Sequence, residues 1–560
     1  MTLAGSERDS ERFDVRLQMM WTRLLSIVEE QAQVLIHTAF SPITRECGDI
    51  SAGIFDTQGR MLAQSVTGTP GHVNTMAVAV NHMMAAFPSE TMVPADVFVM
   101  NDPWLATGHL NDVLLVSPIF LQGKLIAFTS CTSHLYDLGG VGMGPNGRDV
   151  FDEGLFIPPM KLLRAGVMND DLMTLIKANS RSPIANEGDL YALLACCEVG
   201  ERRLNEMMHE FEISRLEDLA AHILTTSEQA SRAAIREVPE GTYHNEMRVD
   251  GYEREVVLKA RLTVEGGQID LDFSGSSPCS RFGINVPINY TAAYSIFALR
   301  CVIGQSIPNN AGSLIPFRVT ADEGSILHAP RPAPVAMRHS IGHFVADVAL
   351  GCLADALSDR IPAESASCMW DIPIRNGDLA DTANGMPGFA IELTHNGGTG
   401  AAPRRDGLSA TAFPNGVWGS QAEVTESTVP VRILRRELRP DSGGAGRYRG
   451  GLGQIIELES SKHAAILLFC SVDRIEHPAR GRAGGQNGAP GEIVLGSGQV
   501  LPGKGEHVIP AGDRLIFRTP GGGGYGDPKE RESSLIRDDV LDGLVSEARA
   551  IEDYGAAAEG

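Results

Sequence analysis

Residues 95–140, ADVFVMNDPWLATGHLNDVLLVSPIFLQGKLIAFTSCTSHLYDLGG, decide the fold. Three apolar runs follow one another in close order, at residues 95–102, 112–120 and 124–134. Near-continuous apolar runs of this kind are typical of strands that are buried on both faces of a sheet. The segments between and after them are polar and contain glycine, so we expect loops that gather ionisable side chains at the strand ends.

Two histidines and an aspartate border these runs. His109 and Asp112 are three residues apart, so an ideal strand would point them to opposite faces. They can share one ion only if the chain turns between them, and Gly108 and Asn111 favour such a turn. His134 lies 25 residues after His109, which is enough for two antiparallel strands joined by a turn. The spacing therefore allows all three side chains to meet.

Asp49 lies where another strand is expected to begin, and it could supply a second carboxylate. Taken singly, such residues have ordinary roles, because an Asp at a turn usually caps it and a strand-end His is usually hydrogen-bonded. Together, Asp49, His109, Asp112 and His134 predict a divalent metal site with positions open for substrate. The nitrogen and oxygen ligands exclude a thiolate-type zinc site and leave Zn, Mn, Fe or Co open.

Composition narrows the class of protein. A chain of 560 residues is too long for one core, so several structural units are expected. The net charge of −23 disfavours nucleic acid and anionic membrane as partners. The N-terminus has no apolar signal core, and no run approaches the roughly 20 apolar residues of a membrane span. Nine cysteines without CxxC spacing favour a cytoplasmic location.

The succession of patterns predicts a multidomain α+β / mixed α/β protein. Residues 1–236 are expected to form a mixed sheet with helices that carries the metal site, and 237–415 a central α+β section. Residues 416–530 should form a β-rich C-terminal domain, followed by a helix and tail at 531–560. Helical spacing of apolar residues predicts helices at 11–38, 74–87, 288–304 and 342–358, and a helical region at 168–236.

Three glycine-containing motifs do not support nucleotide binding. The segment 498–504 has P-loop spacing, but Gly505 replaces the required Ser or Thr and a strand-like run follows. The GxGxxG match at 142–147 contains Pro145 and lacks a strand–helix context. PGGGGYGDP at 520–528 is interpreted as a tight turn that closes the β domain, with close backbone approach to a ligand or partner as the alternative. Any ATP chemistry would have to come from another chain.

Longer blocks carry a family resemblance. They include TAFSPITRECGDISAGIFDTQGRMLAQ, GTPGHVNTM, DVFVMNDPWLATGHLNDVLLVSPIF, SHLYDLGG, DFSGSSPCSRFGINVPINYT and TPGGGGYGDP. From about residue 15 to the tail, the chain resembles the hydantoinase B / 5-oxoprolinase B-domain family, which includes the large subunits of acetone- and acetophenone-type carboxylases.

The resemblance implies a two-part enzyme. It implies a divalent ion on His109, Asp112 and His134, with Asp49 as a further ligand. It also implies a hetero-oligomer with a hydantoinase A-type subunit that binds ATP and phosphorylates a small-molecule carbonyl. The metal-bearing chain would then complete hydrolysis or carboxylation. One departure is Leu135, where many hydantoinase-type members have a second histidine, so a ligand or proton carrier is expected to be missing.

The preferred hypothesis is a subunit of an ATP-dependent cyclic amide or imide hydrolase, in which metal-bound water attacks the activated carbon. Asp137 and Glu153 are candidates for the general base or for support of the ligands. His72 and Asp102 are further supporting candidates. The alternatives are an ATP-dependent ketone carboxylase subunit and a scaffold that has lost its metal, for which Leu135 is the argument.

Overall fold

The N-terminal sheet contains seven strands in the order β2-β1-β5-β4-β3-β6-β7. The computed structural model describes residues 3–376, 389–461 and 465–555. The sequence predicted a mixed sheet, but all strand pairings in this sheet are antiparallel. Hairpin turns join β1 to β2 and β4 to β5, and strands joined by a hairpin pair antiparallel. The strands are β1 (Ile50–Phe55), β2 (Met61–Gln64), β3 (Val97–Met100), β4 (Asp112–Leu121), β5 (Lys124–His134), β6 (Met160–Arg164) and β7 (Val167–Met168).

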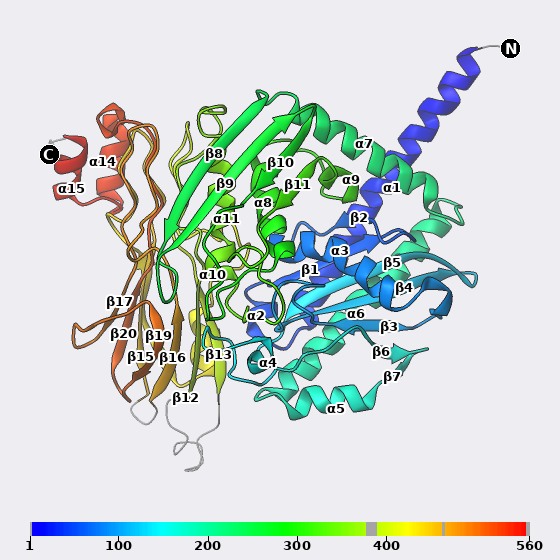
Figure 1. Ribbon diagram of the computed structural model, residues 1–560, viewed down its shortest axis with the longest axis horizontal. Coiled ribbons are helices and arrows are strands. Elements are labelled where there is room, and N and C mark those ends of the chain that lie inside the picture. Colours follow the sequence, from blue (N-terminus) through cyan, green and yellow to red (C-terminus); the bar gives the residue numbers. More distant parts are fainter. Residues whose placement is uncertain (1–2, 377–388, 462–464, 556–560) are drawn as a thin grey trace.

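Helices cover both faces of this sheet, which explains its unbroken apolar runs (Figure 1). Val113 and Leu115 face α1 and α6, whereas Leu114 and Val116 face α3. The predicted helical regions at 11–38, 74–87 and 168–236 are confirmed. The helices are α1 (Leu3–Thr38), α2 (Pro42–Arg45), α3 (Pro70–Ala86), η1 (Ser89–Thr91), α4 (Val150–Glu153), α5 (Asp170–Ala178), α6 (Pro183–Glu210) and α7 (Glu217–Ile235).

The central section is a second, four-stranded sheet with helices packed on it. Its order is β11-β10-β9-β8, and β10 and β11 run parallel. The strands are β8 (Gly241–Val249), β9 (Val256–Glu265), β10 (Gln268–Asp272) and β11 (Phe317–Thr320). The helices are α8 (Ile288–Val302), α9 (Ala311–Leu314), α10 (His339–Gly342) and α11 (Phe344–Cys352). The predicted helix at 288–304 matches α8, whereas the one predicted at 342–358 ends earlier, at Cys352, and α9 and α10 were not predicted.

Two further sheets form the C-terminal side of the molecule, at the left of Figure 1. One has the order β13-β12-β16-β19 and the other β14-β15-β20-β17-β18. The first of these sheets joins strands from both sides of residue 415. The domain boundary expected at 415/416 stays a prediction. The strands are β12 (Trp370–Asn376), β13 (Ala390–His395), β14 (Val431–Leu438), β15 (Gln454–Ser460), β16 (Ile466–Ser471), β17 (Glu492–Leu495), β18 (Val500–Leu501), β19 (Lys504–Ile509) and β20 (Arg514–Arg518).

Short helices complete this side: α13 (Ala422–Thr428), η2 (Pro528–Glu530), α14 (Ser533–Leu541) and α15 (Glu547–Tyr554). The glycine-rich segment at 520–526 lies against other glycine segments, backbone on backbone. The Gly522 amide donates to the Gly451 carbonyl, and the Gly444 amide donates to that of Gly522, both at 2.9 Å. A Cβ on Gly522 would lie 1.9 Å from the Thr399 oxygen. Close backbone approach within the chain therefore accounts for this motif.

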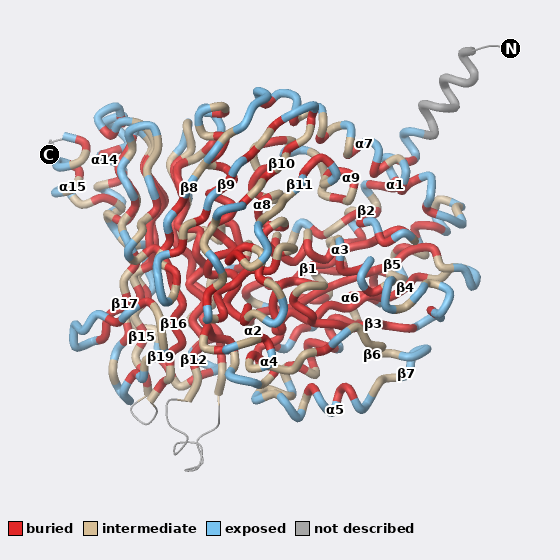
Figure 2. The backbone as a smooth tube through the Cα atoms, in the orientation of Figure 1, coloured by how far each residue is buried: buried red, intermediate tan, exposed pale blue. Residues whose placement is uncertain are grey.

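Burial is concentrated where the N-terminal and central sections meet (Figure 2). Several charged side chains lie among these buried residues, including Asp112 and Arg338. All nine cysteines are unpaired. Among the described helices, none combines the length and apolar character needed to cross a membrane.

Candidate metal centre

The four predicted ligand residues converge at one end of the N-terminal sheet. Asp112 is the first residue of β4, and its register partner on β5 is His134. His109 precedes β4 in a turn in which Gly108 has φ +96°, so the predicted turn is present. Asp49 lies directly before β1, which pairs with β5. Neighbouring strand ends therefore bring these side chains together.

The carboxylate of Asp112 is the centre of the cluster. Its Oδ1 lies 2.8 Å from His109 Nε2 and 3.1 Å from His134 Nδ1. The ligand atoms of these three residues all lie within 4.8 Å of one another, and the same holds for Asp49, His72 and Asp112. All five side chains are buried.

The outer nitrogens of both histidines already have acceptors. His109 Nδ1 lies 3.0 Å from the Ala336 carbonyl oxygen, and His134 Nε2 lies 3.2 Å from a carboxylate oxygen of Glu392. Each ring can donate from that outer nitrogen and keep a lone pair on the nitrogen that faces Asp112. His109 Nε2 lies 2.8 Å from Asp112 Oδ1, but it makes no hydrogen bond of suitable geometry with the described residues. This donor set fits a divalent ion.

Helix α3 contributes the second group around Asp112. His72, in its first turn, places Nε2 2.8 Å from Asp112 Oδ2 and Nδ1 3.5 Å from Asp49 Oδ1. Thr69, the residue before the helix, donates a 2.7 Å hydrogen bond to Asp49 Oδ1. Pro70 at the first helical position favours a helix start here. The β2–α3 connection thus fixes both Asp49 and His72.

A buried arginine balances the charge of this cluster. Arg338 Nη2 lies 2.6 Å from Asp112 Oδ2, and its Nε donates to the Thr107 carbonyl. Burial opposes ionisation of Asp112, but His109, His72 and Arg338 hold the pKa of its carboxyl well below the usual range. Burial and Arg338 lower the pKa of His109 to about 4, so its ring is neutral at pH 7.

His134 differs from His109, because its pKa is raised rather than lowered. Burial disfavours its charged form, but Glu392 and Asp112 raise its pKa well above the ordinary value. A metal ion must therefore displace a proton from this ring, and the affinity of the site for metal should fall as the pH falls.

The cluster faces a cavity of about 30 Å³, room for a water or an ion. Among its charged and histidine lining residues, sequence reasoning missed five: Arg338, His339, His343, Asp371 and Glu392. The segment RHSIGH at 338–343 carried a signal, because its two histidines are four residues apart in the helical region of α10 and α11. Glu392 and Asp371 carried none, since only the pairing of β12 with β13 brings them together.

Burial also shifts the pKa values of these wall residues. Burial and nearby cationic groups lower the pKa of His339 well below its ordinary value and that of His343 to about 3. Burial and the Glu392 carboxylate raise the pKa of Asp371 well above its usual range. His339 Nε2 and one oxygen of Asp371 lie 3.8 Å apart. The wall thus holds neutral histidines beside a carboxyl group that retains its proton.

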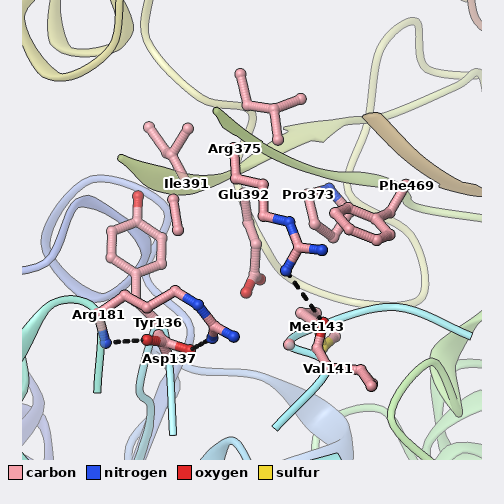
Figure 3. Close-up of a pocket in the computed structure, with 13 residues that line it drawn as sticks. Tyr136, Asp137, Val141, Met143, Arg181, Pro373, Arg375, Ile391, Glu392 and Phe469 are labelled. Carbon is pink, nitrogen blue, oxygen red and sulfur yellow. Dashed lines mark hydrogen bonds and ion pairs between the residues drawn. The ribbon is translucent and has the colours of Figure 1, made fainter. Parts of the chain in front are cut away.

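Asp137 lies in an adjoining pocket (Figure 3). It forms a 2.6 Å ion pair with Arg181 and accepts a hydrogen bond from the Gly139 amide. Glu392 and Met143 line both this pocket and the metal-centre cavity, whereas Asp137 lines only the pocket. Its contacts fix the loop after β5.

Glu153 supports the centre from behind His109. Its carboxylate accepts hydrogen bonds from the Val335 and Ala336 amides at 2.6 and 2.8 Å, and the Ala336 carbonyl in turn lies next to His109 Nδ1. Burial raises the pKa of Glu153 to about 8. Asp102 pairs with Arg331 and bonds the Trp104 amide, and it does not line the cavity.

Leu135 points away from the site. His134 faces the metal-centre cavity, and by strand alternation the next side chain enters the apolar core between the sheet and α6. The inference that Leu135 marks a missing ligand is therefore wrong, and the argument for a metal-free scaffold loses its basis.

The fold and this buried histidine–carboxylate cluster define a candidate metal-dependent protein. The Hydantoinase B/oxoprolinase family profile matches residues 14–528, and the chain belongs to this family.

Three curated relatives cover nearly the whole chain. An uncharacterised protein of Methanocaldococcus jannaschii is 32% identical, and the match covers 94% of this chain and 93% of the relative. The beta chain of the caprolactamase of Pseudomonas jessenii is 29% identical, with 95% and 94% covered. The B component of a putative D-/L-hydantoinase of a Pseudomonas species is 26% identical, with 98% and 96% covered.

Two solved structures share the fold. The ATP-dependent caprolactamase of Pseudomonas jessenii superposes with a TM-score of 0.88 at 26% identity, covering 98% of this chain and 96% of that one. Nucleotide-free acetone carboxylase superposes with a TM-score of 0.84 at 21% identity, covering 97% and 80%. The α+β multidomain fold predicted from the sequence is confirmed.

Proposed function

We propose that this chain is the metal-binding subunit of an ATP-dependent cyclic amide or imide hydrolase. The observation that supports this most strongly is the buried cluster of Asp49, His109, Asp112 and His134, in which each histidine directs one nitrogen toward Asp112 and engages the other elsewhere. The similarity to the caprolactamase beta chain favours a cyclic amide as the substrate class.

The four side chains would hold the ion, and a bound divalent ion would lower the pKa of its water to supply a nucleophile. Arg338 keeps Asp112 ionised, and Glu392 fixes the tautomer of His134. His339 lies at the cavity wall with its Nε2 buried and without a hydrogen-bond partner among the described residues, so it is placed to hydrogen-bond a water or the substrate. Glu153 is assigned to positioning His109 through the Ala336 peptide, and Asp137 to the loop after β5.

A hydantoinase A-type partner would bind ATP and phosphorylate the substrate carbonyl oxygen. The carbonyl carbon of an amide is a poor electrophile. Phosphorylation of the carbonyl oxygen makes this carbon electrophilic enough for attack by hydroxide. Neither glycine motif of this chain that has phosphate-binding spacing lies at the N-terminus of a helix. Relatives named as subunits support a hetero-oligomer.

The test is to co-purify the chain with an A-type subunit and measure ATP-dependent loss of hydantoins and lactams. In parallel, ketone consumption with labelled bicarbonate tests the carboxylase alternative. We expect amide hydrolysis that requires ATP and both subunits. Incorporation of label into a ketone product without amide hydrolysis would overturn the proposal.

A further inference from the structure

A larger cavity lies behind the segment that carries Thr69 and His72. It has a volume of about 490 Å³, within the range of small-molecule sites. One wall is the β2–α3 connection, with Gln64, Pro70 and Asn74, and the other is the C-terminal part of α8 and the loop that follows it. The metal-centre cavity, lined by Thr69 and His72, lies on the other side of this connection.

Arg300 is the one charged side chain among the described residues that line this cavity. Its guanidinium donates to Asn309 Oδ1 and to the Ile307 carbonyl oxygen, both of them neutral acceptors. Burial lowers the pKa of Arg300 to about 10, and no carboxylate in the described part of the chain offsets the effect. A half-buried guanidinium without a carboxylate partner is uncommon, because burial of a charge normally requires pairing.

The remaining lining separates into polar and apolar parts. Asn309 Nδ2 donates to Gln64 Oε1 at 3.0 Å and to Asn74 Oδ1 at 2.9 Å, which orients three amides beside the guanidinium. Apolar side chains, among them Phe297, complete the wall. The cavity therefore offers one cation, oriented amides and an apolar surface.

We propose that this cavity is a binding site for a small organic carboxylate, whose charged end pairs with Arg300 and whose apolar body lies against Phe297. A guanidinium fork matches the two oxygens of a carboxylate. The inference does not depend on the proposed function, since it involves neither the metal, ATP nor the partner subunit.

The test uses hexanoate as the probe and hexanamide as its neutral match, with binding to the purified full chain measured by calorimetry. We expect hexanoate to bind and hexanamide to bind at least roughly tenfold more weakly, since a hydrogen bond to a charged group is stronger than one between neutral groups. Arg300→Gln should weaken hexanoate binding by a similar factor. Arg261→Gln, an exposed arginine on β9, is the matched control and should change nothing.

Cys301→Phe provides a second variant, because it places a bulkier side chain at the cavity wall and leaves Arg300 in place. It should weaken hexanoate binding without changing the circular dichroism spectrum. In wild type, hexanoate should also slow the alkylation of Cys301 by N-ethylmaleimide, followed by peptide mapping. Equal binding of hexanoate and hexanamide, undiminished binding in both variants, tighter binding of inorganic phosphate than of hexanoate, or no hexanoate binding at millimolar concentration would overturn the proposal.

Discussion

At the scale of single residues, Asp112 organises the site because both of its oxygens are engaged. Oδ1 faces His109 and His134, and Oδ2 faces His72 and Arg338. The two faces are not equivalent. Arg338 brings a fixed positive charge to Oδ2, which disfavours a cation there, whereas the Oδ1 face has no such neighbour. We therefore propose that the ion lies on the Oδ1 face, held by His109, Asp112 and His134, with Asp49 as a further ligand from beside His134, since its Oδ2 lies 4.0 Å from His134 Nδ1.

Glu392 tests the tautomer argument. Glu392→Ala removes the acceptor for His134 Nε2 and should weaken metal binding roughly 10–100-fold, as is usual for partners of ligating histidines. Glu392→Gln keeps an oxygen acceptor for His134 Nε2 and should lose less metal affinity than Glu392→Ala. Calorimetric titration of metal-free protein with Zn²⁺ or Mn²⁺ measures both. Equal affinities in wild type and both variants would contradict this role.

Glu153 gives a pH-dependent prediction. Its pKa is raised from 4.5 to about 8 in the folded chain. As the pH rises, the Glu153 carboxyl therefore ionises in the unfolded chain at a lower pH than in the folded chain. Its contribution to stability is therefore highest below pH 4.5 and is lost as the pH rises toward 8. Glu153→Gln does not titrate but can still accept from the Val335 and Ala336 amides. The apparent Tm of wild type should fall relative to that of the variant across this range. Parallel pH profiles for the two would contradict the assignment.

At the scale of elements, the apolar pattern predicted which segments are buried but not how they pair. The runs at 95–102, 112–120 and 124–134 are strands covered on both faces, a pattern more typical of parallel sheets. Here α1 and α6 cover one face of an antiparallel sheet and α3 covers the other. The sequence thus predicted His109, Asp112 and His134, which lie near one another along the chain. The sequence could not predict that Glu392 and Arg338 belong to the site, because only tertiary packing places them next to His134 and Asp112.

The glycine segments make a second prediction at this scale. A Cβ on Gly450 would lie 2.0 Å from the Gly522 carbonyl oxygen, a backbone atom that cannot move aside cheaply. Gly450→Ala should therefore prevent soluble folding or lower the apparent Tm strongly. Gly498→Ala is the control, because only its left-handed backbone (φ +87°) opposes the substitution, at a cost of about 1–2 kcal/mol. Equal effects of the two substitutions on the apparent Tm would show that the glycine packing is not needed.

At the scale of the whole molecule, the sheet that contains β12 and β16 ties the central and C-terminal sections together. Ile374 on β12 pairs with Leu468 on β16, and Trp370 and Ile372 are fully buried in the same core cluster. A chain ending at residue 415 would expose this face.

We predict that residues 1–415 alone do not give a soluble, cooperatively folding protein. A chain ending at residue 530 should remain soluble, because the large core cluster of the central and C-terminal sheets lies outside residues 531–560. Its apparent Tm should fall, because it loses the buried ion pairs of Asp539 with Arg449 and of Arg531 with Asp406. Size-exclusion chromatography and thermal unfolding of the two fragments provide the check. Cooperative unfolding of residues 1–415 would show that the boundary predicted at 415/416 separates independent domains.

The proposed metal centre can be checked by the metal content of the purified chain. Elemental analysis of wild type should find about one divalent ion per chain, since the ligand atoms of His109, Asp112 and His134 lie within 4.8 Å of one another. His109→Ala and Asp112→Asn should retain little metal, with unchanged circular dichroism spectra. Arg261→Gln should retain the full amount. A wild-type protein without metal after loading, or variants that keep a stoichiometric ion, would contradict the account.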